Sequence, residues 1–305
     1  MIVVIGAGPI GTHIAEQYTA AGTPVRVLTR SGSGLAHPLV RRVRVDVTDR
    51  SALQAALEGA RVVHDCMHAS VYHESTWEAE LPGAEQAVLT VAADVGAAVV
   101  FPESLYAFEP APGEAITERT PTSRTAGMGG VRRRLLEARA AAPAATISVA
   151  ASDYLGPGAA DRAVAGDRMV GPAVRGTTAW TIGRTDQPHS WTYLPDLAAA
   201  MIAAAELPNE PDRLLLAPTN EPRTQQELAD GYARAAGREG ARLRRYPRWL
   251  MAALGRFDRG TAGLASMVHL FEAPLVMDSS ASETLLGVAP TPWETVLEET
   301  VVAFG

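Results

Sequence analysis

Four consecutive β-branched residues lead directly into a glycine-rich turn at the start of the chain, in the stretch MIVVIGAGPIGTHIA. Gly6, Gly8 and Gly11 have the spacing GxGxxG, which is typical of a strand that turns into a helix around a dinucleotide pyrophosphate. The first glycine permits the tight turn, the second lets the backbone approach the pyrophosphate, and the third allows close packing of helix and strand. Pro9 and Ile10 open the expected helix, whose free N–H groups point at the phosphates. The pattern predicts a nucleotide-binding α/β domain.

Short β-rich runs alternate with helical stretches along much of the chain. Continuous apolar runs, rather than strict alternation, are typical of strands covered on both faces. The expected strands are residues 2–6, 25–29, 43–47, 61–65, 97–101, 145–150 and 214–218. This order predicts an α/β fold with a Rossmann-type, doubly wound parallel sheet of about seven strands and right-handed crossovers.

The second half of the sequence changes character. Residues 156–195 are rich in Gly, Pro and Arg, and the helical stretches that follow lie between loops. We therefore expect a dinucleotide-binding domain over residues 1–155, to which residues 196–221 return. A smaller, interleaved C-terminal substrate lobe is expected mainly from residues 156–305.

Charge and cysteine content limit the partners of this chain of 305 residues. Its 34 acidic and 27 basic residues give a net charge of −7, which argues against a whole-protein attraction to nucleic acid or to an anionic membrane. A single cysteine excludes an internal disulfide and suits a reducing cytoplasm. We expect no secretory signal, and the longest apolar run, residues 197–207, is too short to span a bilayer. The expectation is a cytoplasmic monomer or homodimer with a small-molecule substrate.

The end of the second expected strand, in VLTRS, bears on cofactor choice. NAD-binding domains usually place Asp or Glu there to bind the ribose 2′-hydroxyl. Thr29 and Arg30 occupy that position here, and a guanidinium can pair with a 2′-phosphate. We therefore expect NADP(H), with NAD as the other option; a solvated surface arginine is the alternative role for Arg30. Asp46 and Val47 end the third expected strand, where the carboxylate can accept from the adenine amino group or cap the next helix.

Four ordered segments resemble the extended short-chain dehydrogenases, the group of NAD-dependent epimerases and dehydratases. They are residues 62–75, 101–110, 152–158 and 189–201. Residues 62–75 resemble the fourth strand and its cofactor-facing turn, which implies that Cys66 and Met67 contact the cofactor. Residues 152–158 resemble a segment that faces the nicotinamide, which implies the same for Tyr154.

Departures from this family's pattern concern its catalytic residues. The tyrosine and the lysine four residues later fall at Met128 and Arg132, and the neighbouring Ser/Thr falls at Pro102. A thioether cannot donate a proton. The arginine that often binds a sugar-nucleotide diphosphate falls at His189, which weakens the case for such a substrate. The chain is similar to a bacterial subgroup that lacks the tyrosine and shares the segments LY, GxVR and SDxxGPG.

Other residues near the expected strand ends can carry the chemistry instead. Tyr106 is a phenol that can supply the proton, and Glu103, just past the fifth strand, can act as acid or base if burial raises its pKa. Arg132 can hold the nicotinamide ribose and lower the pKa of the Tyr106 phenol. Asp153 follows the sixth strand. The structural alternatives are a buried hydrogen-bonded tyrosine, an arginine on a helix face and an aspartate that bonds its own backbone.

Histidines and aromatic residues are the remaining candidates for metal binding and substrate binding. His64 and His68 lie about 13 Å apart if both are on a strand, too far to share one ion, and no cysteine pair is present. We therefore expect no metal site. Tyr72, Trp77 and Trp191 favour an apolar or aromatic pocket, although each can equally belong to the core.

The leading functional hypothesis is an NADP(H)-dependent oxidoreductase that acts on a small, largely apolar carbonyl, enone or imine without the usual Tyr–Lys pair. One alternative is an epimerase or dehydratase acting on a sugar or sugar-like substrate. The other is a non-catalytic NADP-binding sensor. The fold hosts all three classes, so the sequence leaves them open.

Overall fold

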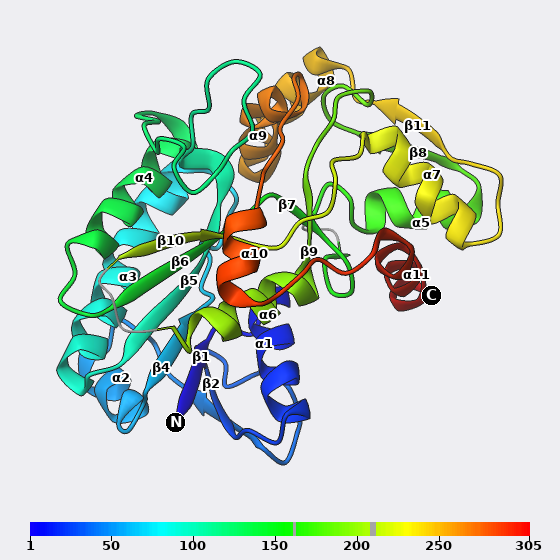
Figure 1. Cartoon of the computed structure of the whole chain (residues 1–305). Helices are drawn as coiled ribbons and strands as arrows, with labels where there is room; N and C mark the ends of the chain where they lie inside the picture. The colour runs from blue at the N-terminus through cyan, green and yellow to red at the C-terminus, as the bar shows by residue number, and fades with distance from the viewer. Residues whose placement is uncertain (161–162, 208–211) are drawn as a thin grey trace.

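The computed structural model describes residues 1–160, 163–207 and 212–305. Its centre is a seven-stranded, entirely parallel sheet with the order β10-β6-β5-β4-β1-β2-β3 (Figure 1). The strands are β1 (Ile2–Ile5), β2 (Val25–Thr29), β3 (Val40–Arg44), β4 (Val62–Asp65), β5 (Ala98–Ser104), β6 (Thr146–Ala151) and β10 (Arg213–Leu216). The predicted Rossmann-type α/β fold with about seven strands is confirmed.

Helices cover both faces of the sheet, each over its own apolar core. On one face lie α1 (Pro9–Ala20) and α6 (Leu194–Ala204), which also pack against each other. The other face carries α2 (Arg50–Leu57), α3 (Glu74–Val95) and α4 (Gly127–Ala140). Strand β1 is buried throughout, which explains its continuous apolar sequence. Strand β4 is also buried throughout, although it ends with His64 and Asp65.

Two of the predicted strands differ from the observed ones. The third was expected at residues 43–47, but β3 ends at Arg44, so Asp46 and Val47 lie beyond it. β3 is an edge strand with exposed arginines, and Val45 and Val47 pack into the core only after the strand has ended. The fifth strand was expected to end at residue 101. It continues to Ser104 because β6 pairs with it throughout, so Glu103 lies within the strand.

A further apolar core lies in the C-terminal part of the chain. Two short parallel pairs belong to this region: β7 (Asp153–Leu155) with β9 (Trp191–Tyr193), and β8 (Thr178–Thr181) with β11 (Arg242–Arg245). The remaining helical elements are η1 (Leu105–Ala107), α5 (Asp167–Arg175), α7 (Gln225–Ala235), α8 (Arg248–Leu254), α9 (Arg259–Ser266), η3 (Val268–Phe271), α10 (Ser280–Leu286) and α11 (Trp293–Phe304). Helix α10 contacts β10 and α6, beside the main sheet (Figure 1). The predicted division at residue 155 stays a prediction.

Local signals set several helix ends. Asp49 caps α2 by accepting from the backbone N–H of Ala52 at 3.0 Å, and Thr224 and Glu227 form a reciprocal capping box at the start of α7. Helix α3 ends at Gly96, which has a φ of +70°.

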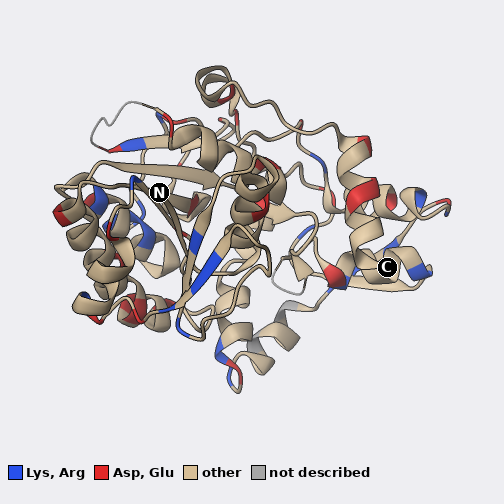
Figure 2. Ribbon diagram, turned by 90° about the horizontal axis from the view of Figure 1, so that it is seen from below, with Lys and Arg blue, Asp and Glu red and all other residues tan. Residues whose placement is uncertain are grey.

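Acidic and basic residues are interspersed over the ribbon seen from below in Figure 2. Among the residues described, none of the helices combines the length and the apolar character that crossing a membrane requires.

Candidate active site

The glycine turn brings the ends of β1 and β4 into direct contact. Gly6 has a φ of +94°, and a Cβ there would lie 2.8 Å from the carbonyl oxygen of Cys66 and 3.3 Å from the amide nitrogen of Met67. A Cβ at Gly11 would lie 2.1 Å from the carbonyl oxygen of Gly6. Side chains are therefore excluded at both glycines, and the structure brings four predicted cofactor residues together.

The start of α1 has the features of a phosphate-binding helix terminus. Gly8 is its N-cap and makes no side-chain cap, and Pro9 occupies the first turn. The loop after β7 lies against this turn, since His13 Nε2 is 2.8 Å from the carbonyl oxygen of Pro157. Tyr154 packs in the same small apolar cluster as Ile10. A glycine turn without room for side chains, followed by an uncapped helix start, fits a dinucleotide pyrophosphate.

The residues predicted for the adenosine end lie where β2 and β3 finish. The Thr29 hydroxyl donates to the carbonyl oxygen of Ser33 at 2.9 Å. Arg30 is exposed and forms no ion pair within the described part of the chain. The Asp46 carboxylate accepts from the backbone N–H of Thr48 at 3.0 Å and from its hydroxyl at 2.7 Å. Asp46 therefore stabilises a turn and does not cap α2, and its contact with adenine stays a prediction.

Cofactor preference gives the first testable prediction. We expect wild type to bind NADP⁺ about ten-fold more tightly than NAD⁺, a difference of about 1.4 kcal/mol, because Arg30 can pair with the 2′-phosphate. Calorimetric titration of Arg30→Ala should show equal affinities. Arg50→Ala is the matched control, since Arg50 is exposed and pairs with Asp94 at 2.8 Å. Equal affinities in wild type, or an unchanged preference in Arg30→Ala, contradict the prediction.

Two tyrosines meet at the carboxyl ends of neighbouring strands. Tyr106 lies in η1 directly after β5, and Tyr72 lies in the loop between β4 and α3. The Tyr72 hydroxyl donates a hydrogen bond of 2.7 Å to the Tyr106 hydroxyl, which leaves the proton of Tyr106 available to another acceptor. We predicted Tyr106 as the proton donor but did not assign chemistry to Tyr72. Its position after β4, next to β5 in the sheet, was the available signal.

An aromatic and apolar cluster surrounds this pair. Trp77 stacks on Tyr106 with ring centroids 6.1 Å apart, and the Arg132 guanidinium lies 4.7 Å from the centroid of Trp77. Met128 is 2% exposed and packs in the same cluster. The position that the resemblance gives to a tyrosine is therefore part of an apolar wall.

Two glycines allow helices to pack closely against the backbones of the two tyrosines. A Cβ at Gly129 would lie 2.4 Å from the carbonyl oxygen of Tyr106, so this glycine lets the start of α4 approach η1. A Cβ at Gly263 would lie 1.8 Å from the carbonyl oxygen of Tyr72, so α9 packs equally closely on the loop after β4. Elements distant in sequence thus fix both phenols.

Burial dominates the protonation of the tyrosine pair. It raises the pKa of Tyr106 well above 10, and the charges of Tyr72 and Asp153 raise it further. Arg132 lowers this pKa, but by less than burial raises it. The expected direction of the Arg132 effect on the Tyr106 pKa is thus correct, but burial outweighs it and the pKa lies above its usual value. At neutral pH Tyr106 is a neutral phenol, a proton donor.

Glu103 lies in a buried ion network on the face of β5 covered by α3 and α4. Its Oε2 is 2.9 Å from Nη1 of Arg139, and its Oε1 is 3.5 Å from Nε of Arg132. Arg139 also binds Glu85 through two contacts of 2.8 Å. Glu103 thus contacts two arginines at once. The terminal nitrogens of Arg132 make no hydrogen bond to any residue that the structure describes.

Asp65, the last residue of β4, adds a third carboxyl group to this region. Its Oδ1 accepts from the backbone N–H of Met67 at 3.1 Å, and its buried Oδ2 has no hydrogen-bond partner in the described part of the chain. Burial, and next the charge of Glu85, raise the pKa of Asp65 to about 7.

A pH dependence of stability follows from Asp65. The carboxyl ionises near 3.8 in the unfolded chain and near 7 in the folded one, so its contribution to stability falls as pH rises between these values and is constant above. We expect wild type to lose about 1–3 kcal/mol relative to Asp65→Asn between pH 4 and pH 8. Urea denaturation at several pH values measures this difference. A difference that is constant with pH contradicts the raised pKa.

Asp153 and His189 form a second polar pair near the tyrosines. His189 Nε2 lies 2.8 Å from Oδ2 of Asp153. The imidazole is 2% exposed and lies between Phe271, stacked at 4.5 Å, and Trp191, at 4.6 Å. His189, where the resemblance places a diphosphate-binding arginine, thus binds a carboxylate of the protein itself.

His64 and His68, which the sequence places too far apart to share a metal ion, lie in different environments. His64 is buried, with its Nε2 3.0 Å from the Tyr18 hydroxyl, and His68 meets the edge of Trp77. In the part of the chain that the structure describes, no group of three His, Cys, Asp or Glu residues is arranged to hold a metal ion.

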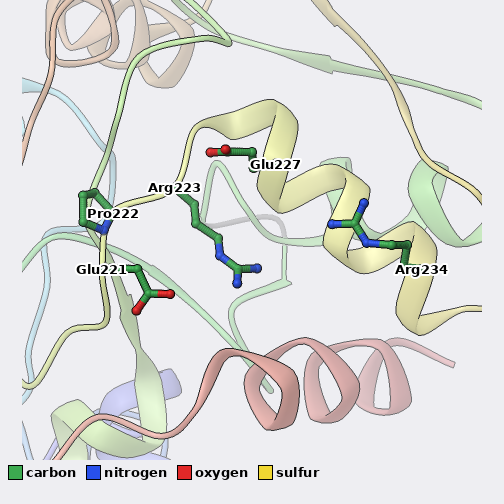
Figure 3. A pocket seen from close by; sticks show the side chains of 5 residues that line it. All are labelled: Glu221, Pro222, Arg223, Glu227 and Arg234. Carbon is green, nitrogen blue, oxygen red and sulfur yellow. The ribbon is translucent and has the colours of Figure 1, made fainter.

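Two surface pockets lie away from the tyrosine pair. One, of about 360 Å³, is formed by α7 and the segment before it; Figure 3 shows its lining residues, Glu221, Pro222, Arg223, Glu227 and Arg234. Its two acidic and two basic side chains balance in charge. The other, of about 230 Å³, lies between the loop at residues 156–158 and α11.

The sheet thus places the glycine turn and both phenols at its carboxyl edge, where nucleotide-dependent α/β enzymes bind their ligands. The chain belongs to the NAD-dependent epimerase/dehydratase family, whose model matches residues 2–216. The predicted family is confirmed, and the membership favours an enzyme over the sensor hypothesis. Comparison with curated proteins finds no match to this sequence.

Several solved structures share the fold. UDP-glucose 4-epimerase from Thermus thermophilus, in complex with NAD, has a TM-score of 0.75 at 20% identity, with 100% of this chain and 99% of that chain covered. UDP-N-acetylglucosamine 4-epimerase from Bacillus cereus has a TM-score of 0.74 at 16% identity, with 99% and 95% covered. A double mutant of dTDP-glucose 4,6-dehydratase from Streptomyces venezuelae, with NAD and DAU bound, has a TM-score of 0.74 at 17% identity, with 100% and 96% covered. At these identities the similarity establishes the fold.

Proposed function

We propose that this protein is an NAD(P)-dependent enzyme that removes hydride from a hydroxyl-bearing carbon of a small sugar-like substrate and returns it to the same molecule, as an epimerase or a dehydratase. The observation that carries the proposal is the hydrogen-bonded pair Tyr72–Tyr106 at the carboxyl edge of the sheet. Family membership supports this alternative over the reductase that the sequence favoured.

The residues of the glycine turn would hold the cofactor. Gly6 and Gly11 permit the tight turn into α1, whose N-terminus would bind the pyrophosphate. Arg30 would bind a 2′-phosphate, and the terminal nitrogens of Arg132 would bind the nicotinamide ribose. The bound nicotinamide supplies the hydride acceptor and donor.

Tyr106 would exchange the substrate proton. As a neutral phenol it donates its proton to the oxygen of a carbonyl that is being reduced, and as a phenolate it accepts the proton of a hydroxyl that is being oxidised. The positive charge of Arg132 favours the phenolate, whereas burial, the Tyr72 hydroxyl and the charge of Asp153 favour the neutral phenol.

Reduction of a small apolar carbonyl, enone or imine is the second candidate. The apolar surroundings of the phenols favour it, because Trp77, Met128 and Met267 are almost completely buried in one cluster. A substrate bound against that cluster would present an apolar surface.

Incubation of the cofactor-loaded protein with a panel of sugar-like alcohols and of apolar carbonyl compounds separates the two. An epimerase or dehydratase changes the substrate without net oxidation or reduction of the cofactor, which NMR of the products and nicotinamide absorbance report together. A reductase consumes one NADPH for each product. If no compound of either class is converted, the proposal fails for these substrates.

A further inference from the structure

We propose that Asp153, held in place by His189, is a specificity residue of this site: it accepts a hydrogen bond from a hydroxyl or amino group of the substrate and excludes phosphate groups. The inference rests on the proposed function only in placing the substrate beside Tyr106. It assigns to Asp153 the recognition of substrate, in place of the catalytic role predicted from the sequence.

The position of Asp153 is fixed by backbone and side chain together. Strand β7 pairs with β9 so that Asp153 lies opposite Trp191. His189 binds the carboxylate at 2.8 Å, and its own ring is held between Phe271 and Trp191. The carboxylate is therefore oriented before any substrate arrives.

The pair keeps the negative charge of Asp153. Nδ1 of His189 is buried and has no hydrogen-bond partner among the residues that the structure describes. Protonation of both ring nitrogens would bury a charged N–H without an acceptor, which costs more than leaving a lone pair unused. The neutral imidazole, with its proton on Nε2, donates to the Asp153 carboxylate and leaves that carboxylate ionised.

The negative charge of Asp153 acts on the two phenols of Tyr72 and Tyr106. Asp153 follows β6, which pairs with β5 as far as the residue before η1. Its negative charge raises the pKa of Tyr72 and of Tyr106, and in both cases by more than Arg132 lowers it. The Asp153 side chain is 16% exposed. A substrate group that reaches the phenols therefore meets a fixed carboxylate, which attracts N–H and O–H groups and repels phosphate.

Binding of UDP to the NADP⁺-saturated protein tests the exclusion of phosphate by calorimetry. Asp153→Asn removes the charge and keeps an oxygen that can accept from His189. We expect it to bind UDP about ten-fold or more tightly than wild type, with a gap that narrows at high salt. Asp186→Asn is the matched control, since Asp186 is exposed and paired with Arg184, and it should bind UDP as wild type does. An unchanged NADP⁺ affinity confirms that the variant is folded.

Methyl glucoside and glucosamine test the acceptor role in the same assay. Both should bind wild type more tightly than Asp153→Asn; a larger loss for glucosamine identifies an amino group, and equal losses identify a hydroxyl. Equal UDP affinity in wild type and Asp153→Asn, or no weakening of either sugar, overturns the inference. These measurements need no turnover. The binding results can therefore support the role of Asp153 even if no substrate is converted, and conversion of a substrate can be found even if the role of Asp153 is overturned.

Discussion

Replacing Tyr106 by phenylalanine is expected to slow single-turnover hydride transfer by about 10²-fold or more while the affinity for NADP(H) stays unchanged. The variant loses the only proton of the pair that is not already donated to a protein oxygen, since Tyr72 donates its own to Tyr106. The phenylalanine ring can still stack on Trp77, so the cluster that holds the site should persist. Rapid mixing with the substrate found in the panel measures the rate.

Two further variants separate proton donation from shape. Tyr72→Phe should cost about ten-fold, because the orienting hydrogen bond is lost while the donor remains. Met128→Ala should stay within about ten-fold of wild type, because no proton transfer is removed. A Tyr106→Phe variant near wild type beside an inactive, folded Glu103→Gln variant would make Glu103 the donor. If both variants keep their rate, the proton comes from water.

Arg139→Met is expected to destabilise the fold by about 3–5 kcal/mol, the second large effect. Arg139 is 1% exposed and binds both Glu85 and Glu103, so its removal leaves two buried carboxylates without their principal partner. Its guanidinium also lies 4.0 Å from the ring centroid of Phe101, a contact that methionine replaces in part. Because Glu103 also faces Arg132, we expect Arg139→Met to disturb the proposed contact between Arg132 and the nicotinamide ribose as well.

Urea denaturation at neutral pH measures the effect. Arg134→Met is the matched control on the same helix; Arg134 is exposed and pairs with Glu78, so its replacement should cost about 0.5 kcal/mol or less. Adding Glu85→Leu to Arg139→Met should recover part of the loss, because the carboxylate that then remains, Glu103, still faces Arg132. A loss below about 1 kcal/mol in Arg139→Met would show that the carboxylates find other partners or protonate.

Local patterns made the sheet predictable. Strands buried on both faces need continuous apolar sequences, and the turn after β1 needs glycine where backbone atoms leave no room, so both can be recognised in short windows. The same rule failed at β3, because an edge strand pairs on one side only and its residues Arg41, Arg42 and Arg44 are exposed. It also failed at the end of β5, where pairing with β6 extends the strand to Ser104.

The candidate site shows the same distinction between what local sequence determines and what tertiary contacts determine. The sequence alone determined the glycine turn, the order of the strands and the position of Tyr106 near a strand end, because each depends on neighbours in the chain. Only the tertiary structure decided that Tyr72 meets Tyr106, that His189 binds Asp153, and that Glu103 is buried between two arginines. These pairs join residues up to 36 positions apart, and their protonation depends on burial from every side. The Tyr106 pKa therefore rises where the charge of Arg132 alone would have lowered it, since desolvation is a property of the assembled core.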